Sequence, residues 1–423
     1  VTTVNFTGYK GEVMAVGERT PVAVLDSAAA SRMAVAEAMT NITAADIDPA
    51  LVKLSANWMA ACGAEGEDAK LFAAVKAASE YCQALNVSIP VGKDSCSMRT
   101  AWDDKDEKKC VTSPVSLIVS AAAPVGNVRL TLTPLLRTDK PSVLALFDLS
   151  GGRARMGASI LAQVAQSFGD TAPDAPDAQK LVRFVKLIRK LTLAGCVTAY
   201  HDRSDGGLAA TLSEMMFASH VGLDVTLDGL IDGAKDVEAA TAALFNEEIG
   251  AVVQIPADRL EDVKSQAAAA GLSDCLFVVA RINTTDTFKV TCGENVLVDE
   301  KRTDLMRVWS EVSHEIARGR DNPACADSEL EVACGTDHQG LFVKTTFDPE
   351  EHPSGPYIHS GDVRPKIAVL REQGVNSQTE MAAAFTKAGF EAWDVHMTDL
   401  LSGRITLCLL YTSDAADERS SVD

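Results

Sequence analysis

The stretch "TAYHDRSDGGLAATLSEMMFASH" (residues 198–220) decides the fold class, because it predicts a strand that stops at a polar turn and resumes as a helix. Val197, Ala199 and Tyr200 predict a buried strand end. Residues 201–205 then crowd charge into the turn, and an Ala/Leu/Met-rich helix follows two glycines. Strand, loop and helix in this order form the building unit of an α/β protein.

The polar turn has two interpretations. Open α/β folds bind ligands just beyond the carboxyl ends of strands, which is where Asp202 and Ser204 fall. Asp205 can cap the following helix, and Gly206 and Gly207 would let backbone N–H groups reach an anion at the positive helix end. The same residues also make an ordinary capped turn, because D-G-G is common turn chemistry. This stretch alone leaves both interpretations open.

Length and composition indicate a protein of two or three domains. The chain has 423 residues, 47% of them hydrophobic and 23% charged. No apolar run approaches the roughly 20 residues that cross a bilayer. The first residues, "VTTVNFTGYKGEVMAVGERT", lack both an initiator Met and the build of a signal peptide. We therefore expect a cytoplasmic protein whose sequence starts inside a longer reading frame.

The charge balance excludes some classes of partner. The chain carries 39 basic and 59 acidic residues, a net charge of −20. Nucleic acids and anionic membranes both reward clustered Lys and Arg, so neither is expected as the main partner. The ten cysteines form no C-x-x-C pair, which predicts reduced cytosolic thiols instead of a disulfide framework or a zinc site.

Periodicity divides the chain into successive segments. Residues 1–125 alternate apolar strands with Ala-rich helices. Residues 126–302 start again with a strand that ends at Asp148 and a glycine-rich loop. In order, we expect strands at 21–27, 51–59, 86–98, 113–125 and 248–256, helices at 28–42, 67–85 and 179–193, and a hairpin at 287–300.

The rest of the chain has a different character. Residues 303–362 are polar and punctuated by Pro and Gly, which predicts a linker with short ordered pieces. Residues 363–407 predict the strand, loop, helix and strand that begin a parallel α/β domain. Residues 408–423, "CLLYTSDAADERSSVD", have no periodicity and are expected to be a non-native tail.

Glu37 and Asn41 are the first candidate metal ligands. They lie four residues apart on the predicted helix 28–42, so their side chains share one face. A carboxylate and an amide oxygen together suit Mg²⁺, which also takes water and phosphate oxygens. A solvated helix face with a C-terminal Asn cap explains the same spacing.

Three further stretches could carry chemistry. In "PVGKDSCSM" (90–98) Lys93 could neutralise a phosphate, although the segment is no P-loop and an exposed loop is equally open. The glycine-rich residues 148–159 only weakly indicate a phosphate-binding loop. "FNEEIGAVV" (245–253) is expected to be a solvated strand start. No G-x-S-x-G or G-x-C-x-G elbow supplies a nucleophile.

The order of these motifs resembles one family. The chain contains "GEVMAVGERTPVAVLDSAAASRMAVAEAMTNI", "LSANWMAACGAEGEDAKLFAAVKA", "IPVGKDSCSMRT", "AYHDRSDGGLAATLSEMMFA", "LFNEEIGAVVQI", "RDNPACADSE" and "RPKIAVLREQGVNSQTEMAAAF". From residue 1 to about 407 it is similar to the large single-chain phosphoribosylformylglycinamidine synthase family (FGAR amidotransferases) of purine biosynthesis.

The resemblance implies a fold and a reaction. The fold is α/β, with synthetase units like the N- and C-terminal domains of aminoimidazole ribonucleotide (AIR) synthetase, followed by the start of a flavodoxin-like class I glutaminase. Residues 1–125 would be the N-terminal-like domain, truncated at its start, and residues 126–302 the C-terminal-like domain. The family is an ATP-dependent carbon–nitrogen ligase that converts FGAR, glutamine and ATP to FGAM, glutamate, ADP and phosphate.

The resemblance also implies site residues. Glu37, Asn41 and Asp202 match Mg²⁺ ligands, and Ser204 matches a contact to the ATP or ADP nucleotide. Lys93, Gly206 and Gly207 are further candidates for nucleotide binding. The glutaminase Cys, His and Glu fall beyond this sequence, as does the first synthetase half, so missing parts of its own chain would be its partners. We therefore expect the fragment to be inactive alone.

Two alternatives stay open at this point. The region could be a non-catalytic scaffold in which Mg-ADP joins the duplicated halves. The chain could also be a stand-alone ATP-dependent enzyme like AIR synthetase, although the start of a glutaminase at 364–407 argues against that. A split site gives the sharpest expectation: Asp202 should face Glu37 and Asn41 across a domain interface.

Overall fold

The computed structural model describes residues 1–5, 8–105, 107–233, 235–336, 343–348, 351, 355 and 364–406, and the backbone of 411–413. The chain divides into two compact units, Val1–His338 and Gln339–Asp423. Each unit is described by itself. Within the described residues, every helix is too short or too polar to cross a membrane.

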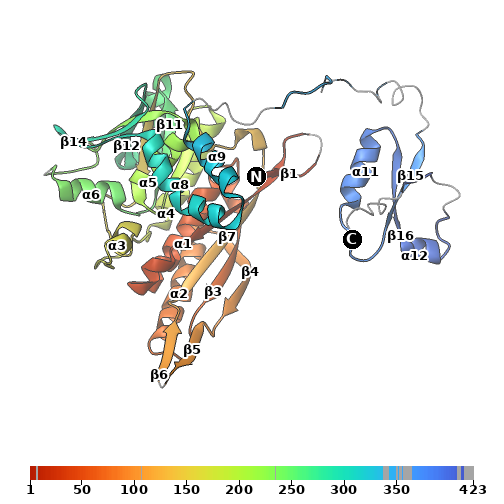
Figure 1. The fold of residues 1–423 in the computed structure, drawn as a ribbon, viewed down its shortest axis with the longest axis horizontal. Helices are drawn as coiled ribbons and strands as arrows, with labels where there is room; N and C mark the ends of the chain where they lie inside the picture. The colour runs from red at the N-terminus through yellow and green to blue at the C-terminus, as the bar shows by residue number, and fades with distance from the viewer. Residues whose placement is uncertain are drawn as a thin grey trace. The chain divides into compact units, whose positions relative to one another are not determined.

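A five-stranded sheet and two helices form the first half of unit one. The sheet order is β1-β2-β7-β3-β4. Helix α1 lies against β2 and β7 and packs on α2 (Figure 1). The bounds are β1 Thr2–Thr3, β2 Gly11–Glu18, α1 Ser27–Ile42, β3 Lys53–Met59, α2 Glu67–Leu85, β4 Ser88–Ser95 and β7 Ser116–Val125, with a separate hairpin of β5 Arg99–Asp104 and β6 Glu107–Thr112.

The prediction of a strand at 21–27 was wrong. Residues Thr20–Val24 form a short 3₁₀ helix with Pro21 in its first turn, where proline's fixed φ favours helical geometry. Asp26 accepts a hydrogen bond from the Ala29 N–H at 2.9 Å and so caps α1. The strand of this region is β2, which precedes the turn.

A seven-stranded sheet forms the second half of unit one. Its order is β14-β13-β10-β12-β8-β11-β9. Strands β8 and β9 both pair antiparallel with β11, so their carboxyl ends lie at the same sheet edge. The strands are β8 Ser142–Asp148, β9 Ala199–Arg203, β10 Gly222–Thr226, β11 Gly250–Pro256, β12 Leu276–Asn283, β13 Thr287–Cys292 and β14 Asn295–Lys301, and the helices are α3 Ile160–Val164, α4 Ala178–Leu193, α5 Gly207–Ser219, α6 Val237–Phe245 and α7 Leu260–Ala269.

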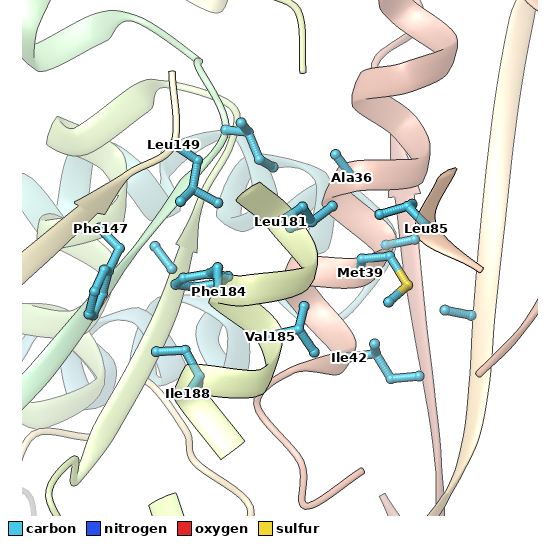
Figure 2. Packing of buried hydrophobic residues seen from close by; sticks show 14 of the residues in the cluster. Ala36, Met39, Ile42, Leu85, Phe147, Leu149, Leu181, Phe184, Val185 and Ile188 are labelled. Carbon is cyan, nitrogen blue, oxygen red and sulfur yellow. The ribbon is translucent and has the colours of Figure 1, made fainter. Parts of the chain in front are cut away.

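Helix α4 joins the cores of the two halves. Figure 2 shows Leu181, Phe184, Val185 and Ile188 of α4 between residues of α1 and residues of β8. The Phe184 and Phe147 rings meet edge to face at 5.5 Å. The other face of the β8 sheet is covered by Leu208, Leu212, Met215 and Met216 of α5. Because one core runs through both halves, α1 and β9 are held in a fixed relation.

The predicted linker begins with packed helices. Helices α8 (Arg302–Arg320) and α9 (Pro323–Cys334) pack on each other, and α8 also contacts α5. The Trp309 ring of α8 lies 5.9 Å from the Phe217 ring of α5. Helix α8 is longer and better packed than the short ordered pieces predicted for a linker at 303–362. Its acidic and basic residues form ion pairs such as Arg307–Glu331 at 2.8 Å, which its polar sequence does not reveal.

The second unit has the predicted strand, loop, helix and strand. Strand β15 (Lys366–Arg371) pairs in parallel with β16 (Glu391–His396), and α11 (Gln378–Lys387) connects them. A short helix, α12 (Met397–Leu401), follows. Strand β17 (Tyr411–Ser413) also pairs in parallel with β15. Apart from these three backbone positions, the predicted non-native tail lies outside the described residues.

Candidate functional site

The carboxyl ends of β8 and β9 create the edge where the site is built. Gly250, the first residue of β11, pairs with Asp148 on one side and Arg203 on the other. The Arg203 Nη2 donates to Asp148 Oδ1 at 2.6 Å, so the two strand ends are tied together. Asp202 precedes this clamp and is 9% exposed.

The structure brings Asp202 to the helix that carries Glu37 and Asn41. The Tyr200 hydroxyl donates to the Thr40 carbonyl of α1 at 2.8 Å. Both groups are buried, so β9 is fastened to α1 one turn from Glu37. Glu37 lies close enough to Asp202 and Asp205 for their negative charges to raise its pKa.

Burial is the main reason that Glu37 is an unusual carboxylate. Loss of solvation raises its pKa to about 7, although Arg19 and the Glu18 N–H oppose the shift. Its Oε2 accepts the Glu18 N–H at 2.6 Å. Asn41 is anchored through its Nδ2, which donates to the Val16 carbonyl at 3.0 Å. A half-buried carboxylate that is short of positive charge favours a cation beside it.

His201 is the positive neighbour of Asp202. Burial lowers the pKa of His201, but hydrogen bonds with Asp202 and Glu214 outweigh it and raise that pKa to about 10. The Nε2 lies 2.8 Å from Glu214 Oε2. The Nδ1 lies 2.8 Å from the Asp202 backbone carbonyl oxygen and 3.2 Å from Asp202 Oδ1. The imidazole is therefore charged at neutral pH and holds one oxygen of Asp202.

Arg19 and Glu247 form a buried ion pair beside this site. The side chains are 3% and 2% exposed, and Arg19 Nη2 donates to Glu247 Oε2 at 2.5 Å. Arg19 Nη1 also contacts Asp205 at 3.0 Å. The prediction of a solvated strand start at 245–253 was wrong, because Asn246, Glu247 and Glu248 are all buried.

Sequence reasoning missed Arg19 and the role of Glu247. Glu248 is likewise paired, with Arg155 at 2.6 Å. Two adjacent carboxylates shortly before a mainly apolar strand indicated burial from the sequence alone, since buried carboxylates require paired cations. Arg19 itself carries no local signal; only the fold brings it to Glu247.

Gly206 and Gly207 are needed for backbone geometry. Both have left-handed φ angles, +78° and +65°. The Gly206 N–H donates to Glu247 Oε1 at 2.8 Å, and the Gly207 N–H donates to the Ser204 carbonyl at 3.0 Å. The protein itself therefore uses both N–H groups here. Phosphate binding by them stays a prediction that would require these bonds to be exchanged.

Lys93 lies on the edge strand β4. Its side chain is exposed, and Nζ donates to the Ser95 hydroxyl at 2.5 Å. Among the described residues it has no hydrogen bond or ion pair with Asp202, Ser204 or Glu37. The structure thus joins Glu37, Asn41 and Asp202 through α1 and β9 but shows no contact that ties Lys93 to them.

The donor set fits Mg²⁺ only in part. In the described part of the chain, no three His, Cys, Asp or Glu side chains are arranged to hold a metal. Glu37, Asp202 and the Asn41 amide nevertheless offer hard oxygens, and each carboxylate keeps an oxygen with no hydrogen bond to a described residue. A Mg²⁺ here would complete its coordination with water and nucleotide phosphates.

Comparison with solved structures supports the fold. The chain is 15% identical to Thermotoga maritima PurL complexed with FGAR, with a TM-score of 0.56 over 71% of this chain and 47% of that chain. T. maritima PurL complexed with ATP is 13% identical, with a TM-score of 0.52. The PurLQS structure from the same organism is 14% identical, with a TM-score of 0.53. Each match covers 71% of this chain and 45% of the other. The chain thus spans less than half the length of these relatives.

Family models match three successive regions. Residues 1–124 match the FGAR-AT PurM_N-like domain, and residues 148–293 match the C-terminal domain of AIR synthase related proteins. Residues 364–411 match the CobB/CobQ-like glutamine amidotransferase domain. These three domains occur in the order that the resemblance in the motifs predicted, and together they support an FGAM synthase-type protein.

Proposed function

We propose that residues 1–302 are a synthetase half that holds a Mg²⁺-nucleotide, ATP or ADP, between α1 and the loop after β9. The protein containing it would convert FGAR, glutamine and ATP to FGAM, glutamate, ADP and phosphate. The observation that carries the proposal is that the Tyr200–Thr40 hydrogen bond joins the strand of Asp202 to the helix of Glu37, near enough for the Asp202 charge to raise the pKa of Glu37.

Each residue has a defined part in this proposal. Glu37, Asn41 and Asp202 would bind Mg²⁺, which neutralises phosphate charge during phosphoryl transfer or in a stored nucleotide. Ser204 would contact the nucleotide, with Lys93, Gly206 and Gly207 as further contacts. His201 orients Asp202 through its 3.2 Å contact, and Arg19 limits the negative charge around Glu37.

Titration calorimetry with Mg-ADP tests the proposal on the 423-residue chain. Glu37→Gln and Asp202→Asn should each weaken Mg²⁺-dependent ADP binding by about tenfold or more, the effect of roughly 1.4 kcal/mol. Glu238→Gln removes an exposed carboxylate from the start of α6 and should change nothing. Unchanged Mg-ADP affinity in both site variants would refute the metal assignment.

A structural nucleotide is the second candidate. The N–H groups of Gly206 and Gly207 and the Arg19 side chain are all engaged within the protein, so they are not free to stabilise charge on a transferred phosphoryl group. Denaturation of the purified chain should then release ADP, with no prior ATP hydrolysis. ATP hydrolysis that depends on Asp202 would instead favour a catalytic nucleotide. A stand-alone AIR synthetase-like enzyme is disfavoured by the glutamine amidotransferase match at 364–411.

A further inference from the structure

A polar cavity is lined by residues other than those of the Glu37–Asp202 site. It has a volume of about 220 Å³ and is formed where the end of β8, the start of α4 and the last turns of α2 meet. We name it the α4 cavity. Its polar lining is Tyr81, Ser150, Arg153, Asp174, Asp177 and Lys180.

The Tyr81 hydroxyl points to a missing partner. Tyr81 is 3% exposed, and its hydroxyl has no hydrogen-bond partner although it is buried. An unsatisfied buried polar group costs about 1–3 kcal/mol. Burial raises the pKa of Tyr81, so the hydroxyl keeps its proton and is available as a donor.

The cavity has a small excess of positive charge, because its two cations face one carboxylate, Asp177, that no described cation pairs. The side chains of Arg153 and Lys180 make no ion pair or hydrogen bond with any described residue. The two carboxylates are already occupied: Arg32 holds Asp174 through two bonds of 2.7 and 2.8 Å, and Asp177 accepts the Lys180 N–H to cap α4. The positive end of a 16-residue helix adds to this charge.

We propose that the α4 cavity binds a small oxyanion of the phosphate class. The Tyr81 hydroxyl would donate to one oxygen, while Lys180 and Arg153 would neutralise the charge. Inorganic phosphate and the phosphoryl group of a sugar phosphate share this chemistry, and the cavity volume admits either phosphoryl group.

Calorimetric titration of inorganic phosphate into the 423-residue chain tests the proposal. Lys180→Met should weaken phosphate binding by about tenfold, the loss of one charge-assisted contact. Lys186→Met, on an exposed position of the same helix, is the matched control and should bind like the parent. Absence of phosphate binding, or equal binding by the parent and Lys180→Met, would overturn the proposal.

Tyr81→Phe tests whether the Tyr81 hydroxyl donates a hydrogen bond to phosphate or is only an unsatisfied buried group. If the hydroxyl binds phosphate, added phosphate should raise the thermal midpoint of the parent more than that of Tyr81→Phe. An equal rise in both would overturn this role. Tighter binding of ribose 5-phosphate than of phosphate identifies a sugar phosphate as the source. Mg-ADP affinity should be unchanged in these variants, so this proposal can fail independently of the nucleotide site.

A different observation concerns Cys62 and Cys96, which lie opposite each other. Ala61 and Ser97 form an antiparallel bridge, and the Cys62 N–H donates to the Cys96 carbonyl at 2.9 Å. Directly opposed hydrogen-bonded residues have Cα atoms about 5.5 Å apart, within the range of a disulfide. Both thiols are reduced and exposed. The Cys96 thiol donates to Asp94 Oδ2 at 3.4 Å, and Cys62 lies near enough to affect the pKa of the Cys96 thiol.

We also infer that Cys62 and Cys96 form a disulfide when a low-molecular-weight disulfide such as oxidised glutathione is present. The Cys62 thiolate attacks one glutathione sulfur and expels the first glutathione thiolate. Cys96 then attacks the Cys62 sulfur and expels the second. The two thiol protons end on the two glutathione molecules. The new bond closes a ring that contains Lys93, and so it fixes a predicted nucleotide-binding segment.

Peptide mass spectrometry after oxidation and alkylation tests this inference. The parent chain treated with oxidised glutathione should yield a Cys62–Cys96 cross-linked peptide. Cys62→Ser and Cys96→Ser should each abolish it and leave the other cysteine glutathionylated. Exposed Cys325 serves as the internal control for non-specific oxidation. Glutathionylation of both cysteines in the parent without a cross-link would overturn the inference.

Discussion

Arg19 shows how one side chain organises the site at the scale of the residue. It comes from the end of β2, yet its guanidinium contacts Asp205 after β9 and Glu247 before β11. Glu247 in turn accepts the N–H groups of Gly206 and Ile160, each at 2.8 Å. One arginine and one glutamate thus connect the loop after β2 with three loops of the second sheet.

Arg19→Met should destabilise the chain by about 3–5 kcal/mol. The change keeps most of the apolar stem but leaves Glu247 buried without its cation. Urea unfolding gives the measurement, and Arg183→Met, an exposed arginine on α4, should fall within about 0.5 kcal/mol of the parent. A loss below about 1 kcal/mol would show that Glu247 is compensated in another way.

The Cys110 thiol should stay reactive toward alkylating reagents at a lower pH than an ordinary cysteine. Its Sγ accepts the Arg99 Nε–H at 2.8 Å, and this contact lowers the pKa of the thiol. The thiolate is the reactive form, so alkylation of Cys110 should persist as the pH falls below the ordinary thiol range. Arg99→Gln should move the pH profile of Cys110 alkylation upward, as followed by peptide mass spectrometry. Identical profiles would contradict the role of Arg99.

At the scale of the element, the start of α5 depends on a close backbone approach. A Cβ atom at Gly207 would lie 2.6 Å from the Asn246 carbonyl oxygen and 2.7 Å from that of Leu244. The helix can therefore begin there only without a side chain. The same packing brings the buried carboxylate of Glu247 to the N–H of Gly206, so the geometry of the loop follows from the glycine pair.

Gly207→Ala should cost much more than Gly195→Ala. Both positions have left-handed φ angles, +65° and +63°, and share a backbone penalty of about 1–2 kcal/mol. At Gly195 nothing lies within 4 Å of the added atom, whereas at Gly207 two carbonyls must move. Urea unfolding should show at least about 2 kcal/mol more loss for Gly207→Ala. Equal losses would mean that the loop relaxes without cost.

At the scale of the whole molecule, the first unit places two sheets and one continuous core around the site. Helix α4 packs on α1 from the first half and on β8 from the second, so the Tyr200–Thr40 contact crosses a rigid boundary. The second unit carries a parallel β15–β16 pair that belongs to the glutamine amidotransferase match. In the proposed reaction, nucleotide binding thus belongs to the first unit and glutamine chemistry to the domain that the second unit matches.

The 423-residue polypeptide should form no FGAM from FGAR, ATP and glutamine. Its sequence contains no G-x-C-x-G elbow that could supply a glutaminase nucleophile. Replacing glutamine with ammonium bypasses the glutaminase step, and it should restore no activity either. Detection of glutamine-dependent FGAM by mass spectrometry would refute the prediction.

Local sequence patterns predicted most elements correctly but failed where charged residues of one element pair with charged residues of another. Helix α2 has the predicted bounds of 67–85, and β8 ends at Asp148 as predicted. The strand predicted at 21–27 is a 3₁₀ helix over Thr20–Val24, because apolar side chains such as Val22 and Val24 fit a strand and a short helix equally well. Helix α8 is longer than the short ordered pieces predicted there, because its charges are paired with α9, a compensation that composition does not reveal.

The sequence by itself determined the α/β class, the order of domains and the face shared by Glu37 and Asn41, because hydrophobic periodicity and local spacing are properties of neighbouring residues. Only the tertiary structure decided that Asp202 comes near Glu37 and that Arg19 neutralises Glu247. Those pairs are separated by 165 and 228 positions. No local pattern encodes such a meeting; it depends on the α4 core that fixes α1 against the second sheet.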